Sequence, residues 1–246
     1  MTNTILHQPE FIGHRQSRMR VLHLPVNYGS LPSHGVRCLK AIGVDAYGLV
    51  FTNTVHQSAD GLKSVYGNFP HRSSRYLTSR LHWMTEVVRA IAFNKPDILH
   101  WYFGREALPL GLDLALVKAL HLPGVVEWQG SDIRIPEQEA AENPYYAAAL
   151  QQGYEYLDVE SRETSLWRQR RFADAGFASC APVGMLQYVQ SDIFPQTYTI
   201  PQRFIVDDYV PVYPDPAKRV PLVVHSPSAP IAKGTSAVLR AVEELK

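Results

Sequence analysis

The sequence has few cysteines and almost no excess charge, and each shortage argues against a class of protein. Only two of its 246 residues are cysteine, Cys38 and Cys180, and their wide separation matches no metal-ligand spacing. Reduced thiols are the simplest interpretation, although a single disulfide stays open. Twenty-four basic and 23 acidic side chains leave a formal net charge of +1. We therefore expect no nucleic-acid partner, and any anion site has to be local.

Long apolar runs are also missing. No stretch approaches the about 20 apolar residues that cross a bilayer. Polar residues interrupt the N-terminus where a signal peptide needs an apolar core, so we expect 1–13 to be a disordered lead and the protein to be cytoplasmic. Hydrophobic residues make up 46% and charged residues 19% of the chain. This mixture is typical of a folded protein with a sizeable core.

Short apolar runs alternate with helical patterns along the chain. The predicted strands are 20–26, 46–51, 97–101, 124–128, 176–179, 198–200 and 220–224, and the predicted helices are 33–42, 74–93, 108–120, 145–152, 159–172, 183–188 and 235–245. Such alternation predicts an α/β fold: a Rossmann-like parallel sheet with right-handed crossovers and helices on both faces. Residues 52–74 have no clear period and are a candidate substrate-covering loop.

The alternation stops once and then restarts, which divides the chain. Residues 14–200 are predicted to form one Rossmann-like domain. Residues 201–219 contain four prolines and predict a linker. A lone strand and helix cannot bury both faces of a sheet, so 220–246 is predicted to be the start of a truncated second domain. The alternative is that the strand at 220–224 joins the edge of the first sheet.

Three strand-end loops carry candidate binding residues, because ligands of open parallel sheets bind at the carboxyl ends of the strands. Gly29 follows the first strand and lets a ligand approach the backbone; an ordinary turn glycine is the alternative. Trp101 and Tyr102 offer aromatic faces for stacking on sugars, or they pack in the core. Residues 129–134 combine amide, hydroxyl, carboxylate and guanidinium groups that suit a polyol, or they cap a helix and form a surface ion pair.

A fourth loop ends in Lys233-Gly234-Thr235, which opens a helix. A lysine beside backbone amides at a helix N-terminus stabilises phosphate oxygens. The loop is not a P-loop, because the spaced glycines of that motif are missing. A solvated surface lysine is the plainer interpretation of Lys233.

Taken together, these segments resemble the GT-B glycosyltransferases of group 1, carbohydrate family four, which use nucleotide-sugar donors and retain the anomeric configuration. The resemblance spans nearly the whole chain. The segments that carry it are the glycine loop at Gly29, Lys95-Pro96-Asp97-Ile98-Leu99-His100, Gln129-Gly130-Ser131-Asp132-Ile133-Arg134, Ile200-Pro201, Val224-His225-Ser226-Pro227-Ser228 and Lys233-Gly234-Thr235. It implies two facing Rossmann-like domains, the first binding the acceptor and the second the nucleotide, with catalysis between them.

The resemblance also implies roles for single residues. They are Gln129 and Asp132 in catalysis, Gly29, Lys233, Gly234 and Thr235 in donor binding, and Trp101, Tyr102, Ser131 and Arg134 in acceptor binding. Gln129 stands where many relatives have a histidine that touches the transferred sugar. Pro227 and Ser228 stand near the place of a usual arginine, so diphosphate binding depends on Lys233 and backbone amides. The paired glutamates of the second domain would lie beyond Lys246.

We therefore expect the amino-terminal part of a retaining glycosyltransferase, with activity of the 246-residue chain by itself left open. The expected partners are a nucleotide-sugar donor, as co-substrate and not cofactor, and a carbohydrate, lipid-linked or small-molecule acceptor. The sequence has no DxD pair, so we predict no metal. A non-catalytic carbohydrate- or nucleotide-binding module is the alternative, whereas an NAD enzyme is disfavoured because no G-x-G-x-x-G follows the first strand.

One predicted helix, 159–172, is strongly basic. Its arginines are Arg162, Arg168, Arg170 and Arg171. Such a helix is a candidate for peripheral contact with anionic lipid at the inner membrane face, although a solvated face is the simpler interpretation.

Overall fold

The computed structural model describes residues 18–53, 57–66, 73–156, 158–200, 210–213, 215, 217, 224–227 and 229–245. The predicted lead at 1–13 and most of the predicted linker at 201–219 lie outside these residues. So does the predicted strand at 220–224, apart from Val224.

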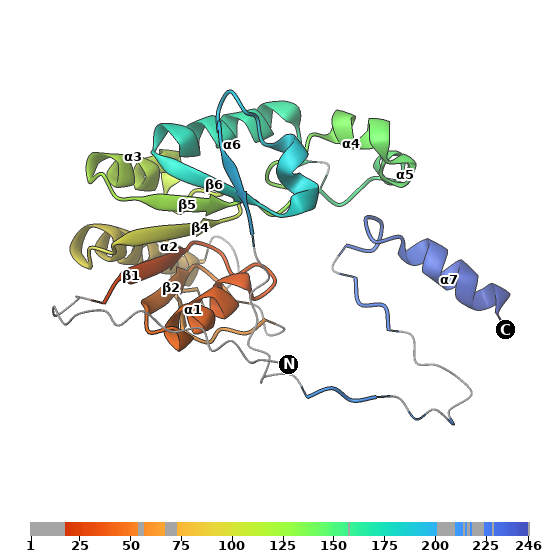
Figure 1. Cartoon of the computed structure of the whole chain (residues 1–246), viewed down its shortest axis with the longest axis horizontal. Coiled ribbons are helices and arrows are strands. Elements are labelled where there is room, and N and C mark those ends of the chain that lie inside the picture. Colours follow the sequence, from red (N-terminus) through yellow and green to blue (C-terminus); the bar gives the residue numbers. More distant parts are fainter. Residues whose placement is uncertain are drawn as a thin grey trace, which may run out of the picture.

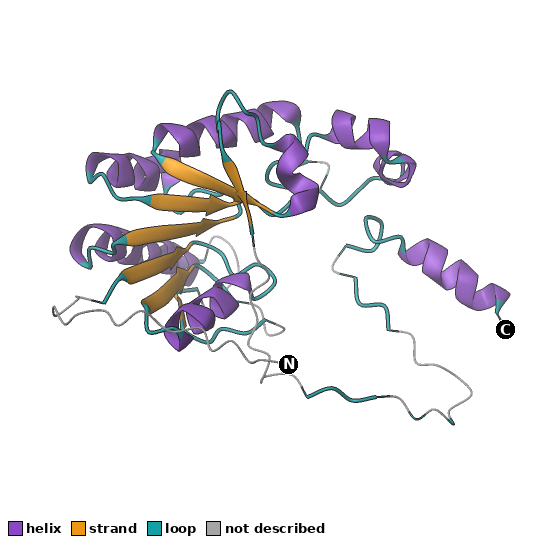
Figure 2. Cartoon of the chain, in the orientation of Figure 1, coloured by secondary structure: helices purple, strands orange, loops and turns teal. Residues whose placement is uncertain are grey.

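The described chain is built on one sheet of seven parallel strands (Figure 2). The strands are β1 Arg20–Leu24, β2 Asp45–Val50, β3 Leu62–Ser64, β4 Ile98–Tyr102, β5 Gly124–Glu127, β6 Phe177–Ala181 and β7 Thr197–Thr199, in the order β3-β2-β1-β4-β5-β6-β7. The predicted Rossmann-like α/β fold is confirmed. The uninterrupted loop predicted at 52–74 is wrong in its middle, because β3 pairs there with β2; with Leu62 as its one apolar side chain, this strand has no readable pattern.

Helices connect almost every pair of strands. They are α1 Leu31–Ala41, α2 Ser74–Val88 with its π-helical continuation η1 Arg89–Phe93, the 3₁₀ turn η2 Pro109–Gly111, α3 Leu112–Ala119, α4 Pro136–Glu142, α5 Pro144–Gln151, α6 Arg162–Asp174, the 3₁₀ helix η3 Val183–Tyr188, and α7 Thr235–Glu244. The sequence prediction missed α4, a helix of about two turns that begins at Pro136 and is followed by Pro144. A proline fits the first turn of a helix, because that turn has no use for its N–H.

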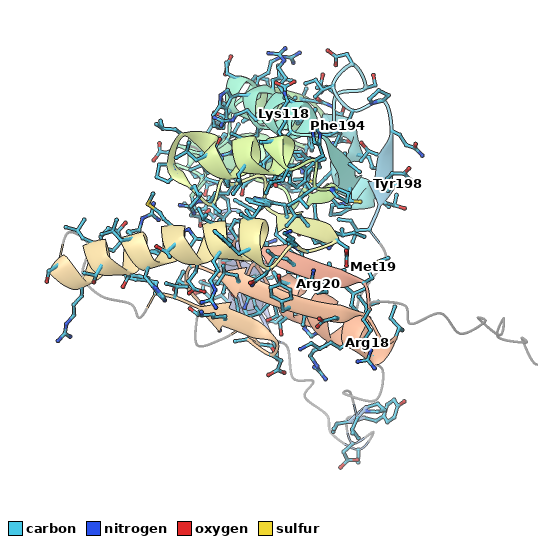
Figure 3. All side chains as sticks on the ribbon, turned by 90° about the vertical axis from the view of Figure 1, so that its left-hand side faces the viewer. Arg18, Met19, Arg20, Lys118, Phe194 and Tyr198 are labelled. Carbon is cyan, nitrogen blue, oxygen red and sulfur yellow. The ribbon has the colours of Figure 1, made fainter. Side chains whose placement is uncertain are left out.

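The two faces of the sheet are covered unequally. Alternate strand residues such as Leu22, Trp101 and Val126 pack with Trp83 of α2 and Phe172 of α6 in the main core. On the opposite face, a smaller cluster of Val21, Val36 and Ala46 lies beneath α1. Figure 1 shows α1 on the opposite side of the strands from α2, α3 and α6. Figure 3 faces the amino ends of the strands, where Arg20 begins β1.

The change of face marks the place for a ligand. The connection from β1 leads outward to β2, whereas the connection from β3 crosses back to β4 on the other side of β1. Because right-handed crossovers in opposite directions place their helices on opposite faces, the carboxyl ends of β1 and β4 diverge into a crevice. The residues after Leu24 and Tyr102 therefore lie where open α/β sheets bind their ligands.

The segment around α7 contacts the sheet domain at one place. Ile231 and Ala232 pack against a cluster of Tyr146, Ala149 and Tyr154 beside α5. Figure 1 shows α4, α5 and α7 on the side toward which the strands point. No residue of α7 itself is buried. Among the described helices, none combines the length and the apolar character that crossing a bilayer requires.

Candidate functional site

Two cavities lie at the carboxyl ends of the strands. The first, called here the outer cleft, has a volume of about 520 Å³ and receives residues from the β1 and β5 loops, from α4 and α5, and from the start of α7. The second, called the arginine cavity, has a volume of about 570 Å³ and lies among the loops after β1, β2 and β4, beside α2 and α6. Four of the predicted site residues have side chains at the outer cleft, and Gly234 lines it as well. These four are Gln129, Ser131, Arg134 and Lys233.

Asp132 holds the loop after β5 in shape. Its Oδ1 accepts hydrogen bonds from the backbone N–H groups of Gly130 at 2.7 Å and Gln129 at 3.0 Å. The residue is fully buried, and this burial raises the pKa of its carboxyl to about 6, against the opposing effect of the two N–H groups. Asp132 is buried and does not line the outer cleft, so the structure gives it a role in shaping the loop, and its predicted catalytic role stays a prediction.

Gln129 lines the outer cleft, and a hydrogen bond fixes the position of its side-chain amide there. Its Nε2 donates to Glu127 Oε1 at 2.7 Å. The other carboxylate oxygen of Glu127 lies 2.8 Å from His100 Nε2. Because Glu127 is buried, this chain from β4 through β5 fixes the orientation of the Gln129 amide. The prediction that Gln129 acts at the reacting centre is compatible with its position and stays a prediction.

Arg134 lines the outer cleft but is already committed to a buried cluster. Its Nη1 donates to Glu160 Oε1 at 2.7 Å and to the Tyr154 hydroxyl at 2.9 Å. The Tyr146 hydroxyl donates to the other oxygen of Glu160 at 2.7 Å, and its ring lies 5.6 Å from the Arg134 guanidinium. Burial raises the pKa of Glu160, while the Tyr146 hydrogen bond and Arg134 oppose that rise. Because the Glu160 carboxylate compensates the Arg134 guanidinium, Arg134 would attract an anionic ligand less strongly than an unpaired arginine.

The Lys233 turn brings the chain back to the outer cleft from a distant part of the sequence. Lys233 and Gly234 line the cleft, and Arg240 of α7 lines it farther along. Gly234 is the residue before α7 and has a positive φ of 64°. Thr235 is placed differently: among the described residues that line the cleft it is absent, and its hydroxyl lies 2.9 Å from His225 Nε2. Thr235 therefore does not line the outer cleft as Lys233 does, and its predicted donor role stays a prediction.

A carboxylate of the sheet domain already binds this turn. Glu155 Oε1 accepts from Ile231 N at 2.7 Å, and Oε2 accepts from Ala232 N at 3.1 Å. Desolvation raises the pKa of Glu155, but the backbone N–H groups of Ile231, Ala232 and Glu155 itself together outweigh it and lower the pKa below its ordinary value. Two backbone donors beside Lys233 therefore face an anion, which is supplied by the protein itself.

Trp101 and Tyr102, predicted to stack on a sugar ring, both have fully buried side chains. Trp101 donates from Nε1 to the Arg105 carbonyl at 2.8 Å and contacts Phe172 edge-on. The Tyr102 ring stacks on His100 at 4.4 Å. Both residues pack in the core, as the alternative interpretation expects, and their role in acceptor binding stays a prediction.

Gly29 lies in a tight turn before α1. It has a positive φ of 56°, which glycine adopts at little cost, and Ser30 after it also has a positive φ and is the N-cap of α1. Among the described residues, Tyr28 and not Gly29 lines the outer cleft, and the Tyr28 ring stacks on Phe103 at 5.4 Å. Gly29 therefore lies beside a residue of the outer cleft, and its predicted donor role stays a prediction.

The sequence analysis missed a group of tyrosines around α5. They are Tyr145, Tyr146, Tyr154 and Tyr156, and all line the outer cleft. Their density within twelve residues, next to a predicted helix, was a signal that could have identified them. Aromatic rings with hydroxyl groups suit both stacking and hydrogen bonding to a polar ring.

Two further findings concern metals and relatives. Within the part of the chain that the structure describes, no three or more histidine, cysteine, aspartate or glutamate residues are grouped so that they could hold a metal ion. No protein-family model and no curated protein matches this chain.

Proposed function

We propose that this chain provides the acceptor-side part of a glycosyltransferase that transfers a sugar from a nucleotide-sugar donor with retention of configuration. One observation supports it most. The outer cleft combines the polar loop of Gln129, Ser131 and Arg134 with Lys233 and Gly234, which are far away in the sequence. A cleft that joins amide, hydroxyl and cationic groups suits a ligand with both a polyol and a phosphate part.

The cationic side chains differ between the two ends of the cleft. Lys233 and Arg240 enter from the turn and the helix on the donor side, whereas Arg134 is compensated by Glu160. Fixed positive groups stabilise the charge that develops on a departing diphosphate. The proposal therefore assigns the diphosphate to Lys233 and Arg240, and the sugar to the Gln129 amide and the tyrosine rings.

In the proposed transfer, one bond breaks, one bond forms and one proton moves. The bond between the anomeric carbon and the diphosphate oxygen breaks, and a bond forms from that carbon to the acceptor oxygen on the same face of the ring. The acceptor hydroxyl proton passes to a phosphate oxygen of the leaving group. Lys233 stabilises that leaving group, and Gln129, oriented by Glu127, hydrogen-bonds to the sugar.

Titration of the chain with UDP, GDP and ADP tests the donor side. We expect one of them to bind, and Lys233→Gln to weaken that binding about tenfold, because one charge-assisted hydrogen bond is lost. Lys118→Gln is the matched control, since Lys118 lies in the last turn of α3 and outside the cleft. Absence of binding by all three nucleotides, or equal loss in both variants, would count against the proposal.

A transfer assay separates the enzyme from a non-catalytic carbohydrate- or nucleotide-binding module. Incubation with nucleotide sugars should release nucleoside diphosphate, and the anomeric proton of the product should show the configuration of the donor by NMR. Nucleotide binding with no release of diphosphate would favour the module, and an inverted product would exclude the retaining reaction.

A further inference from the structure

The arginine cavity has a chemistry that the outer cleft does not explain. It lies beyond the carboxyl ends of β1, β2 and β4, in the crevice where the connections change face, with α2 and α6 beside it.

Three arginines from three separate elements line this cavity. Arg80 comes from α2, Arg105 from the loop after β4, and Arg168 from α6. Among the described lining residues Glu106 is the one acid, and it is engaged by Arg171 outside the cavity, with Nη1 and Oε1 2.8 Å apart. The cavity therefore gathers positive charge with little negative charge to balance it, which an anionic ligand would supply.

The positive groups also act on each other. Burial is the main reason that the pKa of Arg168 is lowered; Asp132 opposes this effect, Arg105 lowers the pKa further, and Glu160 raises it. Arg168 is held in place because its Nη1 donates to the Asp132 carbonyl at 3.0 Å. A guanidinium fixed this way remains close to a second one, an arrangement that an anion between them would stabilise.

The opposite wall of the cavity presents hydrogen-bond acceptors. Asn27 Nδ2 donates to the Ser58 carbonyl at 2.8 Å and to Asn53 Oδ1, which fixes the orientation of the amide. Within the described part of the protein, Asn27 Oδ1 and Gln57 Oε1 are buried and have no hydrogen-bond partner. Asn27 is only 8% exposed. Acceptor oxygens of this kind are satisfied by hydroxyl groups.

An aromatic wall completes the cavity. Trp167 is half exposed, and its indole lies beneath the Arg171 guanidinium at 4.8 Å. Phe51 lies beneath Arg80 at 5.0 Å. Arg80, one of the three arginines that line the cavity, is thus held over a flat ring without a ligand, which lowers the entropy lost when it binds one.

We propose that the arginine cavity binds a hydroxylated phosphate ester, with its phosphate against Arg80, Arg105 and Arg168 and a hydroxyl against Asn27 and Gln57. Calling this ester the sugar acceptor rests on the function proposed above, whereas the binding itself does not. The ester is either a soluble sugar phosphate or a lipid headgroup with the same two groups.

Calorimetric titration of the full chain with glucose 6-phosphate and glucose tests the anion part. Glucose 6-phosphate should bind at least about tenfold more tightly than glucose, and Arg80→Gln and Arg105→Gln should each weaken it about tenfold. Arg89→Gln is the matched control, because Arg89 follows α2 but lies outside the lining. Equal binding of both sugars, or equal loss in all three variants, overturns the proposal.

The hydroxyl part has its own test. Gln57→Leu removes one acceptor oxygen, so it should weaken glucose 6-phosphate several-fold and leave inorganic phosphate unchanged, because that anion needs only the arginines. An equal effect on both probes would mean that Gln57 acts only on the shape of the cavity, and the hydroxyl contact would be wrong.

Vesicles distinguish the two sources of the ester. Phosphatidylglycerol carries a phosphate and two hydroxyls, and its vesicles should sediment the chain in competition with glucose 6-phosphate if the ester is a lipid headgroup. Phosphatidylcholine vesicles are the control. Binding to neither vesicle, with glucose 6-phosphate still bound, supports the soluble source; binding to neither probe overturns both.

The same variants separate this inference from the proposed function. Lys233→Gln should leave glucose 6-phosphate binding unchanged, since Lys233 lines the other cavity. Ester binding without nucleotide binding would sustain the inference and remove the transferase. Nucleotide-dependent transfer to uncharged sugars only would sustain the transferase and overturn the assignment of the ester as its acceptor.

Discussion

The two sides of the outer cleft differ in how their residues are held. The loop at 129–134 is fixed from within, because the buried Asp132 carboxylate binds two of its N–H groups and Arg168 binds its carbonyls. The turn at 229–234 is held from outside, by the exposed carboxylate of Glu155 and a small contact with tyrosines. The first side therefore has a preformed geometry, whereas the position of the second depends on few interactions.

This difference indicates which side suits residues that select a substrate by hydrogen bonds and which suits residues that neutralise a phosphate. A residue that selects a substrate by hydrogen bonds needs a fixed orientation, as the Gln129 amide has through Glu127. A residue that neutralises a phosphate needs only to come close, as Lys233 can from an exposed turn. Four predictions break or sharpen the comparison.

The largest effect is expected at Glu160. Glu160→Ala leaves the Arg134 guanidinium and two tyrosine hydroxyls without their shared acceptor, so the free energy of unfolding should fall by about 3 to 4 kcal/mol. Urea denaturation measures it. Glu163→Ala, in the first turn of the helix α6 that follows Glu160, should cost well under about 1 kcal/mol. A similar loss in both variants would mean that the cluster does not hold this side of the cleft.

The second effect concerns Asp132 and pH. Because its pKa is raised to about 6 in the folded protein, the folded state holds a proton that the unfolded state releases. Stability from this group is therefore complete below about pH 4 and is lost as the pH rises through 6, by about 3 kcal/mol. Asp132→Asn should remove this part of the pH dependence, measured as the wild-type and variant unfolding free energies from pH 4 to 7. Parallel curves would contradict the raised pKa.

The third effect compares Gly104, which packs against Trp128 just before the loop at 129–134, with Gly234 of the turn at 229–234. A Cβ at Gly104 would overlap the Trp128 ring, and the φ of 34° is already unfavourable for other residues. Gly104→Ala should therefore cost about 2 to 3 kcal/mol. A Cβ at Gly234 meets nothing within 4 Å, so Gly234→Ala should cost only about 1 kcal/mol for its φ of 64°. Thermal unfolding of the two variants gives the difference, and equal costs would show that neither side is packed more tightly.

The smallest effect is local. Glu155→Ala should leave global unfolding unchanged and speed hydrogen exchange at the Ile231 and Ala232 amides about tenfold, because both lose their acceptor. Glu155→Gln, which retains one acceptor oxygen, should give an intermediate rate. Unchanged exchange in Glu155→Ala would show that the turn is held by its apolar contacts alone.

Local patterns predicted most of the fold because apolar runs and helical periods depend on neighbouring residues. The segments at 20–26 and 124–128 became β1 and β5 nearly as expected. The three-residue β3 was missed because its pairing with β2 is a tertiary event. The helix predicted at 33–42 begins earlier, at Leu31, and Ser33 is buried against Ser58.

The site was less predictable, because a residue type does not reveal its exposure. Trp101 and Trp167 look alike in the sequence, yet the first is in the core and the second lines the arginine cavity. Likewise, the predicted basic helix does not present one uniform surface: Arg168 turns inward and Arg171 pairs with Glu106. Only the packing of α6 on the sheet decides which arginine faces which way.

The two outermost strands have a consequence for how this protein behaves at high concentration. β3 and β7 contain three residues each, and β3 carries Lys63, which pairs with Glu86. Short edge strands with charged side chains offer little backbone for another sheet to extend. Growth of this sheet into fibrils by strand addition is thus disfavoured at both edges, even though its central strands are strongly apolar.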